Sequence, residues 1–207
     1  MDAAVVRVLD LYDQRIAAEA KLWGQPGVSI DDFLLPIGPA AGALLNTIIK
    51  GAEARHILEI GTSYGYSTIW LAEAARETGG KVVSLDLAPR KQDHAREMLE
   101  MAGLAAYVDF RAGDALELIP TLEDSLDFIL LDCWKDIYIP CLERFHPKLA
   151  PGGMVAADNM IYPPSSHADA IAYRRAVRAK ADMSSVLLSV GSGLEISRKA
   201  SKLDDGL

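Results

Sequence analysis

The amino-acid sequence predicts an α/β protein of the doubly wound, Rossmann-like class, with a seven-stranded, mostly parallel sheet that ends in a C-terminal antiparallel hairpin. A helical cap is expected on the N-terminal side of this sheet. Short runs rich in Leu or β-branched residues alternate with longer segments of helical period, a pattern typical of a parallel sheet that helices cover on both faces. The last two apolar runs are separated only by a short Gly-Ser-Gly turn, so they can pair only as an antiparallel hairpin.

The elements are expected in the following order. Two helices, at residues 3–23 and 39–50, precede the sheet, and the Pro- and Gly-rich segment GQPGVSIDDFLLPIG joins them. Because this segment carries exposed apolar residues, we interpret residues 23–37 as a lid. Five parallel strands with helical crossovers follow, and they are predicted at HILEI (56–60), KVVSLD (81–86), YVDFRA (107–112), LDFILLD (126–132) and GMVAAD (153–158). A helix near residues 168–180 precedes the hairpin strands at 185–190 and 193–199.

Composition limits the domain number and the class of partner. A chain of 207 residues, 50% of them hydrophobic, suits one domain over residues 1–207, with residues 1–50 as the cap and lid segment and 51–207 as the α/β core. The net charge of −8 and the lack of a Lys/Arg cluster longer than a pair argue against nucleic acid as a partner. No apolar run approaches the roughly 20 residues that span a membrane, and two cysteines without a signal-peptide pattern favour a cytoplasmic protein.

The stretch LEIGTSYGYSTIWLA, residues 58–72, predicts a strand end, a tight glycine turn and a helix start. It lacks the Lys of a phosphate-binding P-loop, and Ser63 stands where a dinucleotide fingerprint needs glycine. Gly61 opens the turn, Glu59 precedes it, and Asp86 ends the next strand, where an acid can hydrogen-bond a ribose diol. An acidic turn without Lys suits a cofactor that has a ribose and an ammonium group but no phosphate, such as S-adenosylmethionine. The alternative is that these residues only form a turn and cap a helix.

Oxygen-bearing side chains follow two neighbouring predicted strands. Asp132 ends one strand, and Asp158 and Asn159 end the next, so the three side chains are expected to meet at the carboxyl edge of the sheet. An oxygen-only ligand set favours Mg²⁺ over zinc, which prefers His and Cys. The alternative is that the two Asp residues act as helix caps or turn residues.

Lys135 lies near the start of a predicted helix, where the helix dipole disfavours a cation. A lysine near a metal and a sulfonium has its charged form disfavoured, which makes it a candidate general base. The alternative is a solvated lysine that pairs with Asp136 or Glu143.

The segments EIGTSYGYS, LLDCWKDIY and AADNM, in this order and spacing, resemble the cation-dependent catechol and caffeoyl-CoA O-methyltransferases from about Phe33 to Lys199. The resemblance implies a class I methyltransferase fold, S-adenosylmethionine as donor, and Mg²⁺ or another divalent cation held by Asp132, Asp158 and Asn159. It implies Lys135 as the catalytic base and a contact of Glu195 with the substrate or the metal-ligand side of the pocket. The cofactor-binding residues that it implies are Ile37, Glu59, Gly61, Thr62, Ser67, Asp86, Asp114, Ala115, Asp132 and Trp134.

The chain departs from this family at residues that shape the pocket. Cys133 stands where the catechol enzymes have a histidine, and their gate residues fall on Phe33 and Leu35. Asp31 and Asp32 are the only charges between residues 24 and 45, which argues against a large anionic acceptor such as a coenzyme A ester. We therefore expect a small diphenol as substrate.

The function expected from the sequence is Mg²⁺-dependent transfer of a methyl group from S-adenosylmethionine to one hydroxyl of a small vicinal-diol aromatic. A nucleoside- or dinucleotide-binding oxidoreductase and a non-catalytic binding protein on a methyltransferase scaffold stay open as alternatives. A homodimer is conceivable through the apolar residues of the first helix, which are Val5, Val6, Val8, Leu9 and Leu11. The alternative is that this stripe packs on its own sheet.

Overall fold

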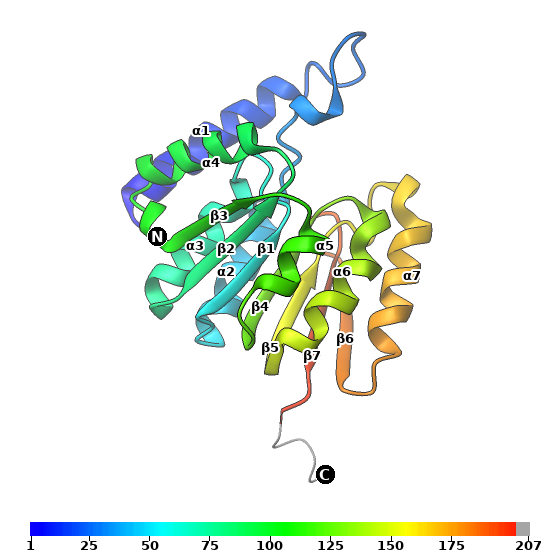
Figure 1. Cartoon of the computed structure of the whole chain (residues 1–207). Coiled ribbons are helices and arrows are strands. Elements are labelled where there is room, and N and C mark those ends of the chain that lie inside the picture. The colour runs from blue at the N-terminus through cyan, green and yellow to red at the C-terminus, as the bar shows by residue number, and fades with distance from the viewer. Residues whose placement is uncertain (202–207) are drawn as a thin grey trace.

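The computed structural model describes residues 1–201 and has a seven-stranded sheet with helices on both faces (Figure 1). The strands are β1 (His56–Ile60), β2 (Lys81–Asp86), β3 (Val108–Ala112), β4 (Leu126–Leu131), β5 (Leu149–Ala157), β6 (Met183–Leu188) and β7 (Leu194–Lys199). The helices are α1 (Ala3–Glu19), α2 (Pro39–Gly51), α3 (Tyr66–Thr78), α4 (Pro89–Met101), α5 (Ala115–Leu118), α6 (Tyr138–Phe145) and α7 (His167–Arg178). Residues 202–207 of the predicted core lie outside the described part of the chain.

The strand order is β3-β2-β1-β4-β5-β7-β6. Neighbours among β1 to β5 pair in parallel, whereas β7 is antiparallel to both β5 and β6. The predicted fold class is therefore confirmed, including the terminal hairpin. The helices that connect β1, β2 and β3 lie on one face of the sheet and those that follow β3, β4 and β5 lie on the other, as in a doubly wound fold with right-handed crossovers.

The largest differences from the predicted boundaries are in β5, β6 and the first helix. β5 begins at Leu149 rather than at residue 153, because Leu149 pairs with Leu126 and the register then shifts before Met154 pairs with Phe128. The hairpin strand β6 spans Met183–Leu188, and the residues after it form the turn. The first helix ends at Glu19, and turns lead from there into the lid.

The sheet carries an apolar layer on each face. In β4, Phe128 and Leu130 belong to the layer under α1 to α4, whereas Ile129 and Leu131 belong to the layer under α5 to α7. Successive strand residues point to opposite faces, so a strand buried on both sides needs a nearly continuous apolar run. This is why LDFILLD is so strong a strand signal.

The helix α1 buries most of its apolar stripe in its own domain. Val5, Val8 and Leu9 belong to the layer under α1 to α4, which leaves Val6 and Leu11 as exposed apolar residues of the stripe. Packing on its own core is therefore the better account of this stripe. No helix among residues 1–201 is long and apolar enough to cross a membrane.

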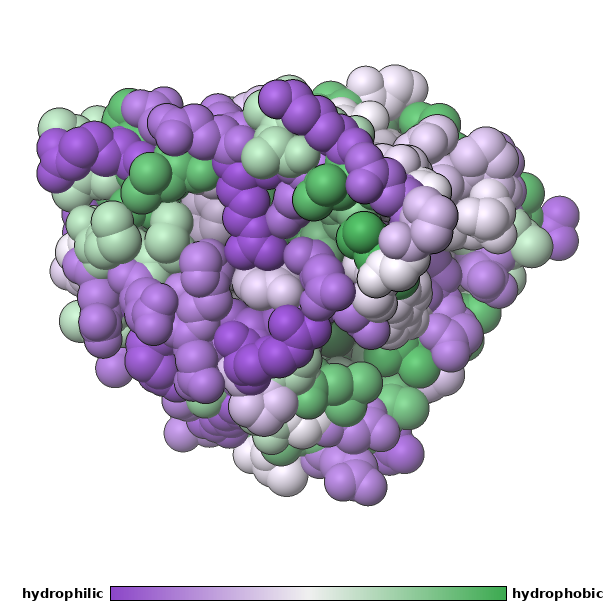
Figure 2. Space-filling model, turned by 90° about the horizontal axis from the view of Figure 1, so that it is seen from above, coloured by the Kyte–Doolittle hydropathy of each residue, from purple (hydrophilic) through white to green (hydrophobic). Residues whose placement is uncertain are grey.

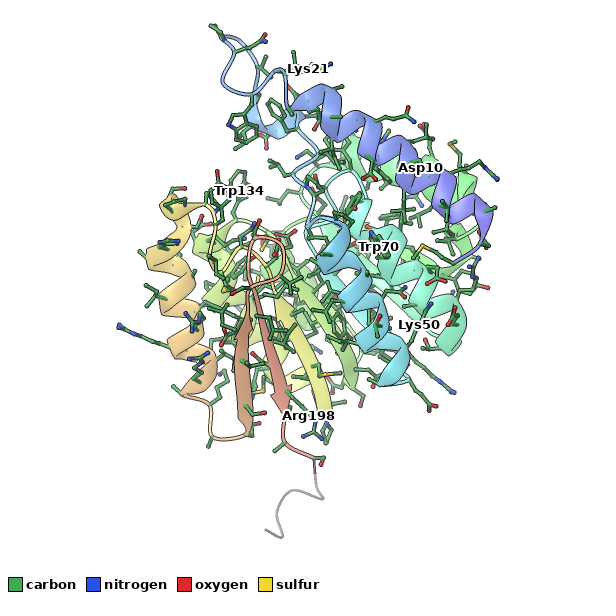
Figure 3. The ribbon with its side chains drawn as sticks, turned by 180° about the vertical axis from the view of Figure 1, so that it is seen from behind. Asp10, Lys21, Lys50, Trp70, Trp134 and Arg198 are labelled. Carbon is green, nitrogen blue, oxygen red and sulfur yellow. The ribbon has the colours of Figure 1, made fainter. Side chains whose placement is uncertain are left out.

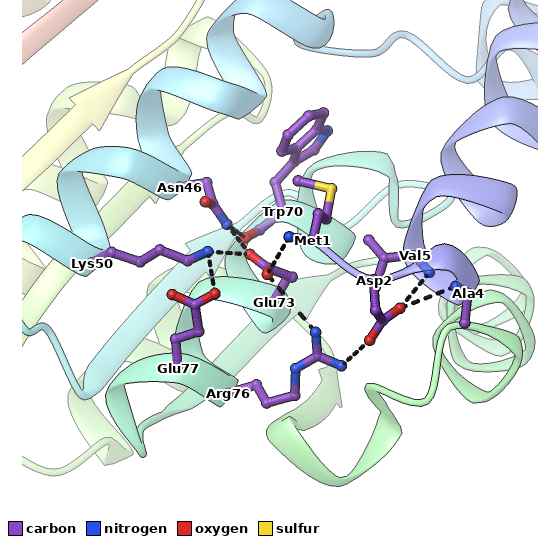
Figure 4. Close-up of polar contacts among 10 residues, drawn as sticks. All are labelled: Met1, Asp2, Ala4, Val5, Asn46, Lys50, Trp70, Glu73, Arg76 and Glu77. Carbon is purple, nitrogen blue, oxygen red and sulfur yellow. Dashed lines mark hydrogen bonds and ion pairs between the residues drawn. The ribbon is translucent and has the colours of Figure 1, made fainter.

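A buried charge cluster holds the helices behind the sheet together (Figure 4). The carboxylate of Glu73 on α3 is fully buried and accepts hydrogen bonds from Lys50 Nζ at 2.7 Å and Asn46 Nδ2 at 2.6 Å, both on α2. Burial alone would raise the pKa of Glu73, but these two donors outweigh it and hold the pKa below its usual value. Arg76, one turn further on α3, binds the N-cap residue Asp2 of α1 at 2.8 Å. The cap helices are thus fixed to the core.

Candidate active site

A cavity of about 840 Å³ opens at the carboxyl edge of the sheet, between the strand ends and the lid. Figure 2 looks down on this edge and shows apolar groups around the hollow in the middle of the face, between hydrophilic groups. In Figure 3, Trp134 lies at this end of the sheet, whereas Arg198 lies at the opposite end. The loops after β1, β2, β4 and β5 all contribute walls, as expected for a ligand site in an open α/β sheet.

The glycine turn after β1 forms the floor of this cavity. Gly61 has φ +109°, and a Cβ atom on it would lie 2.0 Å from the carbonyl oxygen of Asp132. Only glycine allows the turn to approach the loop after β4 so closely. Thr62 and Ser67 line the cavity beside it, so three of the predicted cofactor residues share one wall.

Glu59 differs from the expectation. Its side chain is fully buried below the turn and does not line the cavity. It accepts hydrogen bonds from the hydroxyls of Ser67 at 2.6 Å, Thr68 at 2.7 Å and Ser84 at 2.5 Å. Burial raises the pKa of Glu59 to about 7 in spite of these donors. Glu59 therefore supports the turn from below. Its side chain does not reach the cavity, so it is not in position for the predicted direct contact with the methionine end of the cofactor.

Asp86, at the end of β2, lines the cavity as predicted. Its carboxylate accepts hydrogen bonds from Ser63 N at 2.7 Å and from Ala88 N at 2.8 Å, which ties the end of β2 to the glycine turn. Asp114 and Ala115 line the same part of the cavity, and Asp114 also caps α5 by accepting from Leu116 N at 2.8 Å. Ile37 and Trp134 line it as well, the first almost fully buried and the second 57% exposed.

The three predicted metal ligands are adjacent to one another at the ends of β4 and β5. Asp132 and Asn159 line the cavity, and the side chain of Asp158 is 1% exposed with its Oδ1 atom lacking any hydrogen-bond partner among the described residues. Burial, and then the charge of Asp132, raise the pKa of Asp158 to about 8. Burial also raises the pKa of Asp132, which Lys135 opposes. Because Asp132 and Asp158 are close together, a negative charge on one of them disfavours ionisation of the other.

The predicted metal ligands Asp132, Asp158 and Asn159 supply the oxygen atoms of two carboxylates and one amide. Within residues 1–201, no group of three or more His, Cys, Asp or Glu side chains is placed to hold a metal ion. A cation at this edge would therefore depend on the amide oxygen of Asn159 in addition to the acids. Asn159 adopts a left-handed backbone conformation with φ +57°, which asparagine tolerates better than most residues.

Lys135 lies in the short 3₁₀ turn Lys135–Ile137 that precedes α6. Its Nζ atom donates to Cys133 O at 3.0 Å, to Tyr138 Oη at 2.5 Å and to Asn159 Oδ1 at 2.9 Å. It also lies 3.8 Å from Asp132 Oδ1, and its side chain is 11% exposed. The structure thus places this lysine inside the cluster and does not support the alternative of a solvated surface lysine.

Glu195 lies outside the cavity, contrary to the expectation of a catalytic contact. It is fully buried on β7 opposite Ala157 and accepts from Arg174 at 3.1 Å, Arg178 at 2.7 Å and Ser185 at 2.5 Å. Because the side chain points toward α7 rather than toward the strand ends, its charge is neutralised by two arginines of that helix. We assign Glu195 to this structural ion pair.

Several cavity residues have no signal in the sequence pattern. Tyr162 and Pro163 line the cavity from the loop after β5, with Ser192 from the hairpin turn. These two loops are joined, since Ile161 N and Tyr162 N both donate to Ser192 O, at 2.9 and 3.0 Å. Contacts between loops far apart in the sequence depend on the fold, so no local motif reports them.

Basic residues on α4 also line the cavity mouth. Arg90 lies 3.4 Å from Asp32, and Lys91 lies 3.8 Å from Asp31. The acidic charge of the lid is therefore paired, and the mouth is less acidic than the lid sequence alone suggests.

Comparison with known proteins identifies the family. Residues 58–160 match the family model described as a methyltransferase domain. A catechol O-methyltransferase of Mycobacterium tuberculosis is 33% identical over an alignment of 150 positions that covers 70% of this chain and 68% of that protein. The chain belongs to the S-adenosylmethionine-dependent O-methyltransferases. A caffeoyl-CoA O-methyltransferase of Eucalyptus globulus is 31% identical over an alignment of 181 positions that covers 77% of this chain and 73% of that protein.

The solved structures agree with this family. An O-methyltransferase from Bacillus cereus in complex with SAH has a TM-score of 0.75 and 27% identity, with 96% of this chain and 91% of that chain covered. Among the relatives found by sequence, a catechol O-methyltransferase from Niastella koreensis aligns with this chain over only 61% of its own length. The methyltransferase is thus an enzyme of the catechol and caffeoyl-CoA type, and the alternatives of an oxidoreductase and of a non-catalytic binding protein are set aside.

Proposed function

We propose that this methyltransferase transfers the methyl group of S-adenosylmethionine to one hydroxyl of a small catechol-type aromatic with the help of a divalent cation, Mg²⁺. The observation that carries the proposal is the buried Oδ1 atom of Asp158, which has no hydrogen-bond partner within residues 1–201, beside Asp132 and Asn159. A buried acceptor without a donor is destabilising, and a bound cation would satisfy it.

The residues at the ends of β4 and β5 fit a hard cation. Asp132, Asp158 and Asn159 offer oxygen atoms only, which suits Mg²⁺ better than zinc. A positive ion beside the two acids would oppose the burial that raises their pKa values. When bound, such an ion supplies charge stabilisation to a deprotonated hydroxyl and fixes its orientation.

The chain's own residues would supply the remaining chemistry. Lys135, held within the cluster by three hydrogen bonds, would take the proton from the attacking hydroxyl. The positive charge of the sulfonium and the negative charge of the phenolate disappear together during transfer. Positioning in a dry cavity should therefore matter more than stabilising a new charge, and the lid with Leu35 and Ile37 would exclude water.

The cofactor half of the cavity is proposed along the glycine turn and Asp86. We expect Asp86→Ala to weaken S-adenosylmethionine binding by about 1–3 kcal/mol, because a buried ribose hydroxyl would lose its charged acceptor. Isothermal calorimetry measures the affinity. Asp86→Asn is the conservative comparison, since its single side-chain oxygen can keep one of the two hydrogen bonds from Ser63 N and Ala88 N. Unchanged affinity in the Ala variant would place the ribose elsewhere.

The acceptor half of the cavity supports a small, neutral aromatic substrate. Its walls include Tyr162 and Pro163 from the loop after β5, with Ser166 and Ser192. These groups can hold a flat ring and hydrogen-bond a polar substituent.

A panel assay tests the proposed substrate class. With labelled S-adenosylmethionine and Mg²⁺, we expect catechol to be methylated and phenol to give less than about 1% of that rate, because one oxygen cannot chelate the cation. A coenzyme A ester of a catechol acid forms the third arm, since Arg90 and Lys91 lie at the mouth. Equal turnover of phenol and catechol would refute chelation as the basis of selection, and a strong preference for the ester would enlarge the substrate class.

The cytoplasmic location and a homodimer remain predictions for this methyltransferase. The burial of most of the α1 stripe within its own core leaves little of that surface to support a dimer.

A further inference from the structure

Tyr138 has no assigned role in the proposed reaction, but it contacts the proposed base directly. It is the first residue of α6, three residues after Lys135, and its side chain is 1% exposed. Its hydroxyl lies 2.5 Å from Lys135 Nζ, and the lysine ammonium lies 4.2 Å from the centre of its ring. This is the shortest of the three hydrogen bonds that Lys135 makes.

The surroundings of the Tyr138 hydroxyl fix the direction of its hydrogen bonds. The hydroxyl lies 2.9 Å from Leu131 O and 3.3 Å from Asp158 O. Carbonyl oxygens can only accept, so the hydroxyl hydrogen must point toward one of them. A lone pair of the oxygen is then left for Lys135. The hydroxyl therefore connects the lysine to the ends of β4 and β5, the two strands that lead into Asp132 and Asp158.

The hydrogen bonds of Lys135 divide into two kinds. Asn159 Oδ1 belongs to the proposed cation site, whereas Cys133 O and Tyr138 Oη belong to the loop and helix that carry the lysine. The bonds from Lys135 to Cys133 O and Tyr138 Oη do not involve any proposed metal ligand. Of these two, only the bond to Tyr138 comes from a side chain, so it is the one that a substitution can remove.

A second buried tyrosine provides an internal comparison. Tyr173 on α7 packs against Tyr138 edge to face, with ring centres 5.5 Å apart and planes at 78°. It is also fully buried, but its hydroxyl has no hydrogen-bond partner in the described part of the chain. The two tyrosines thus share burial and packing, and they differ in the contact with Lys135.

We propose that Tyr138 is a positioning residue that aims the Lys135 amine at the acceptor hydroxyl by anchoring it to the ends of β4 and β5. This inference rests on the proposed function of Lys135 as the base. The ring of Tyr138 fills the core, and its hydroxyl serves the site. A phenylalanine at this position keeps the packing and removes only the anchor.

The first experiment compares Tyr138→Phe with Tyr173→Phe, using catechol, Mg²⁺ and S-adenosylmethionine. We expect Tyr138→Phe to lower kcat by about tenfold to a hundredfold, the size of effect known for small misplacements in an active site, with KM for catechol within about twofold of wild type. Tyr173→Phe should leave both constants unchanged. Equal effects in the two variants, or a change in KM alone, would show a packing role and overturn the proposal.

A double-mutant cycle separates this proposal from the proposed function. If Tyr138 acts through Lys135, Tyr138→Phe should cause no further loss of kcat in a Lys135→Ala background. An equal loss in both backgrounds would overturn the positioning role while leaving the base intact. Full activity of Lys135→Ala would instead refute the base, and with it the inference that depends on it.

A spectroscopic readout does not need turnover. A buried, hydrogen-bonded ammonium group exchanges its protons slowly, so Lys135 should give a lysine ¹H–¹⁵Nζ NMR signal, assigned by its absence in Lys135→Arg. We expect Tyr138→Phe to shift this signal or remove it through faster exchange, and Tyr173→Phe to leave it in place. A signal unchanged in Tyr138→Phe would show that the hydroxyl does not hold the amine, even if catechol is not the substrate.

Discussion

Asp158→Ala should lower methyl transfer by about a thousandfold, which corresponds to about 4 kcal/mol of transition-state stabilisation. The substitution removes the unpartnered Oδ1 atom that carries the case for a cation site. Calorimetric titration with Mg²⁺ should then show no binding, while the melting temperature shows whether the fold is kept. Asp109→Ala is the matched control, because this acid lies on the edge strand β3 with its side chain 51% exposed. Full activity of the wild-type enzyme in excess EDTA would contradict the cation requirement.

The same site gives a pH test of cation binding. Burial and the neighbouring Asp132 raise the pKa of Asp158 to about 8, so at pH 7 the carboxyl group holds a proton that the cation must displace. Mg²⁺ affinity should therefore rise with pH and level off above pH 8. Titrations in two buffers of different ionisation enthalpy measure the released proton directly. Binding that releases no proton at pH 7 would place the cation away from Asp158.

Glu59→Gln should stabilise the protein by about 3 kcal/mol at pH 8 and change its stability little below pH 4.5. The reason is that burial raises the pKa of Glu59 from its usual 4.5 to about 7. Between these values the folded protein keeps a proton that the unfolded chain has released. Wild-type stability from this group is therefore fully present below pH 4.5 and is lost as the pH rises to 7. A glutamine stays neutral, so it avoids this loss.

Chemical denaturation at several pH values measures the difference between Glu59→Gln and the wild type. Effects of other titrating groups cancel in this difference when they do not contact residue 59. Glu123→Gln is the control, because Glu123 is exposed on the surface and the substitution removes the same type of charge. A difference that does not change between pH 4.5 and 8 would mean that Glu59 is ionised in the folded protein at low pH.

The sequence predicted the sheet well because burial on both faces leaves a strong local pattern. HILEI and KVVSLD match β1 and β2 at both ends, since each residue of a central parallel strand meets one apolar layer or the other. The start of β5 was harder to predict, because Pro151 and Gly152 lie close to it in a region where the pairing is irregular. Polar residues directly after parallel strands were also predictable, as Asp86 and Asp132 illustrate, because topology brings strand ends to one edge.

Residues within strands and on distant loops were less predictable. Glu195 lies on an antiparallel strand, where a change of one residue moves a side chain to the other face, and here the acid points to the arginines of α7. Glu59 precedes the glycine turn by two residues, but three hydroxyl donors from α3 and β2 hold it below the cavity. Tyr138 was visible in the motif LLDCWKDIY, but its role depends on carbonyl oxygens that only the fold brings near it.

Gly61 packs so closely against the Asp132 carbonyl that a Cβ atom on it would lie only 2.0 Å from the carbonyl oxygen. This packing would make the geometry of methyl transfer independent of the choice of acceptor. In the proposed reaction the methyl donor would lie along the turn after β1 and the acceptor beside the loop after β4, and the backbone of the turn packs directly against the backbone of that loop. The walls that would select the acceptor, such as Leu35 and Tyr162, belong to other loops. Substitutions in those walls can therefore broaden or narrow the range of acceptors while the line along which the methyl group travels stays the same.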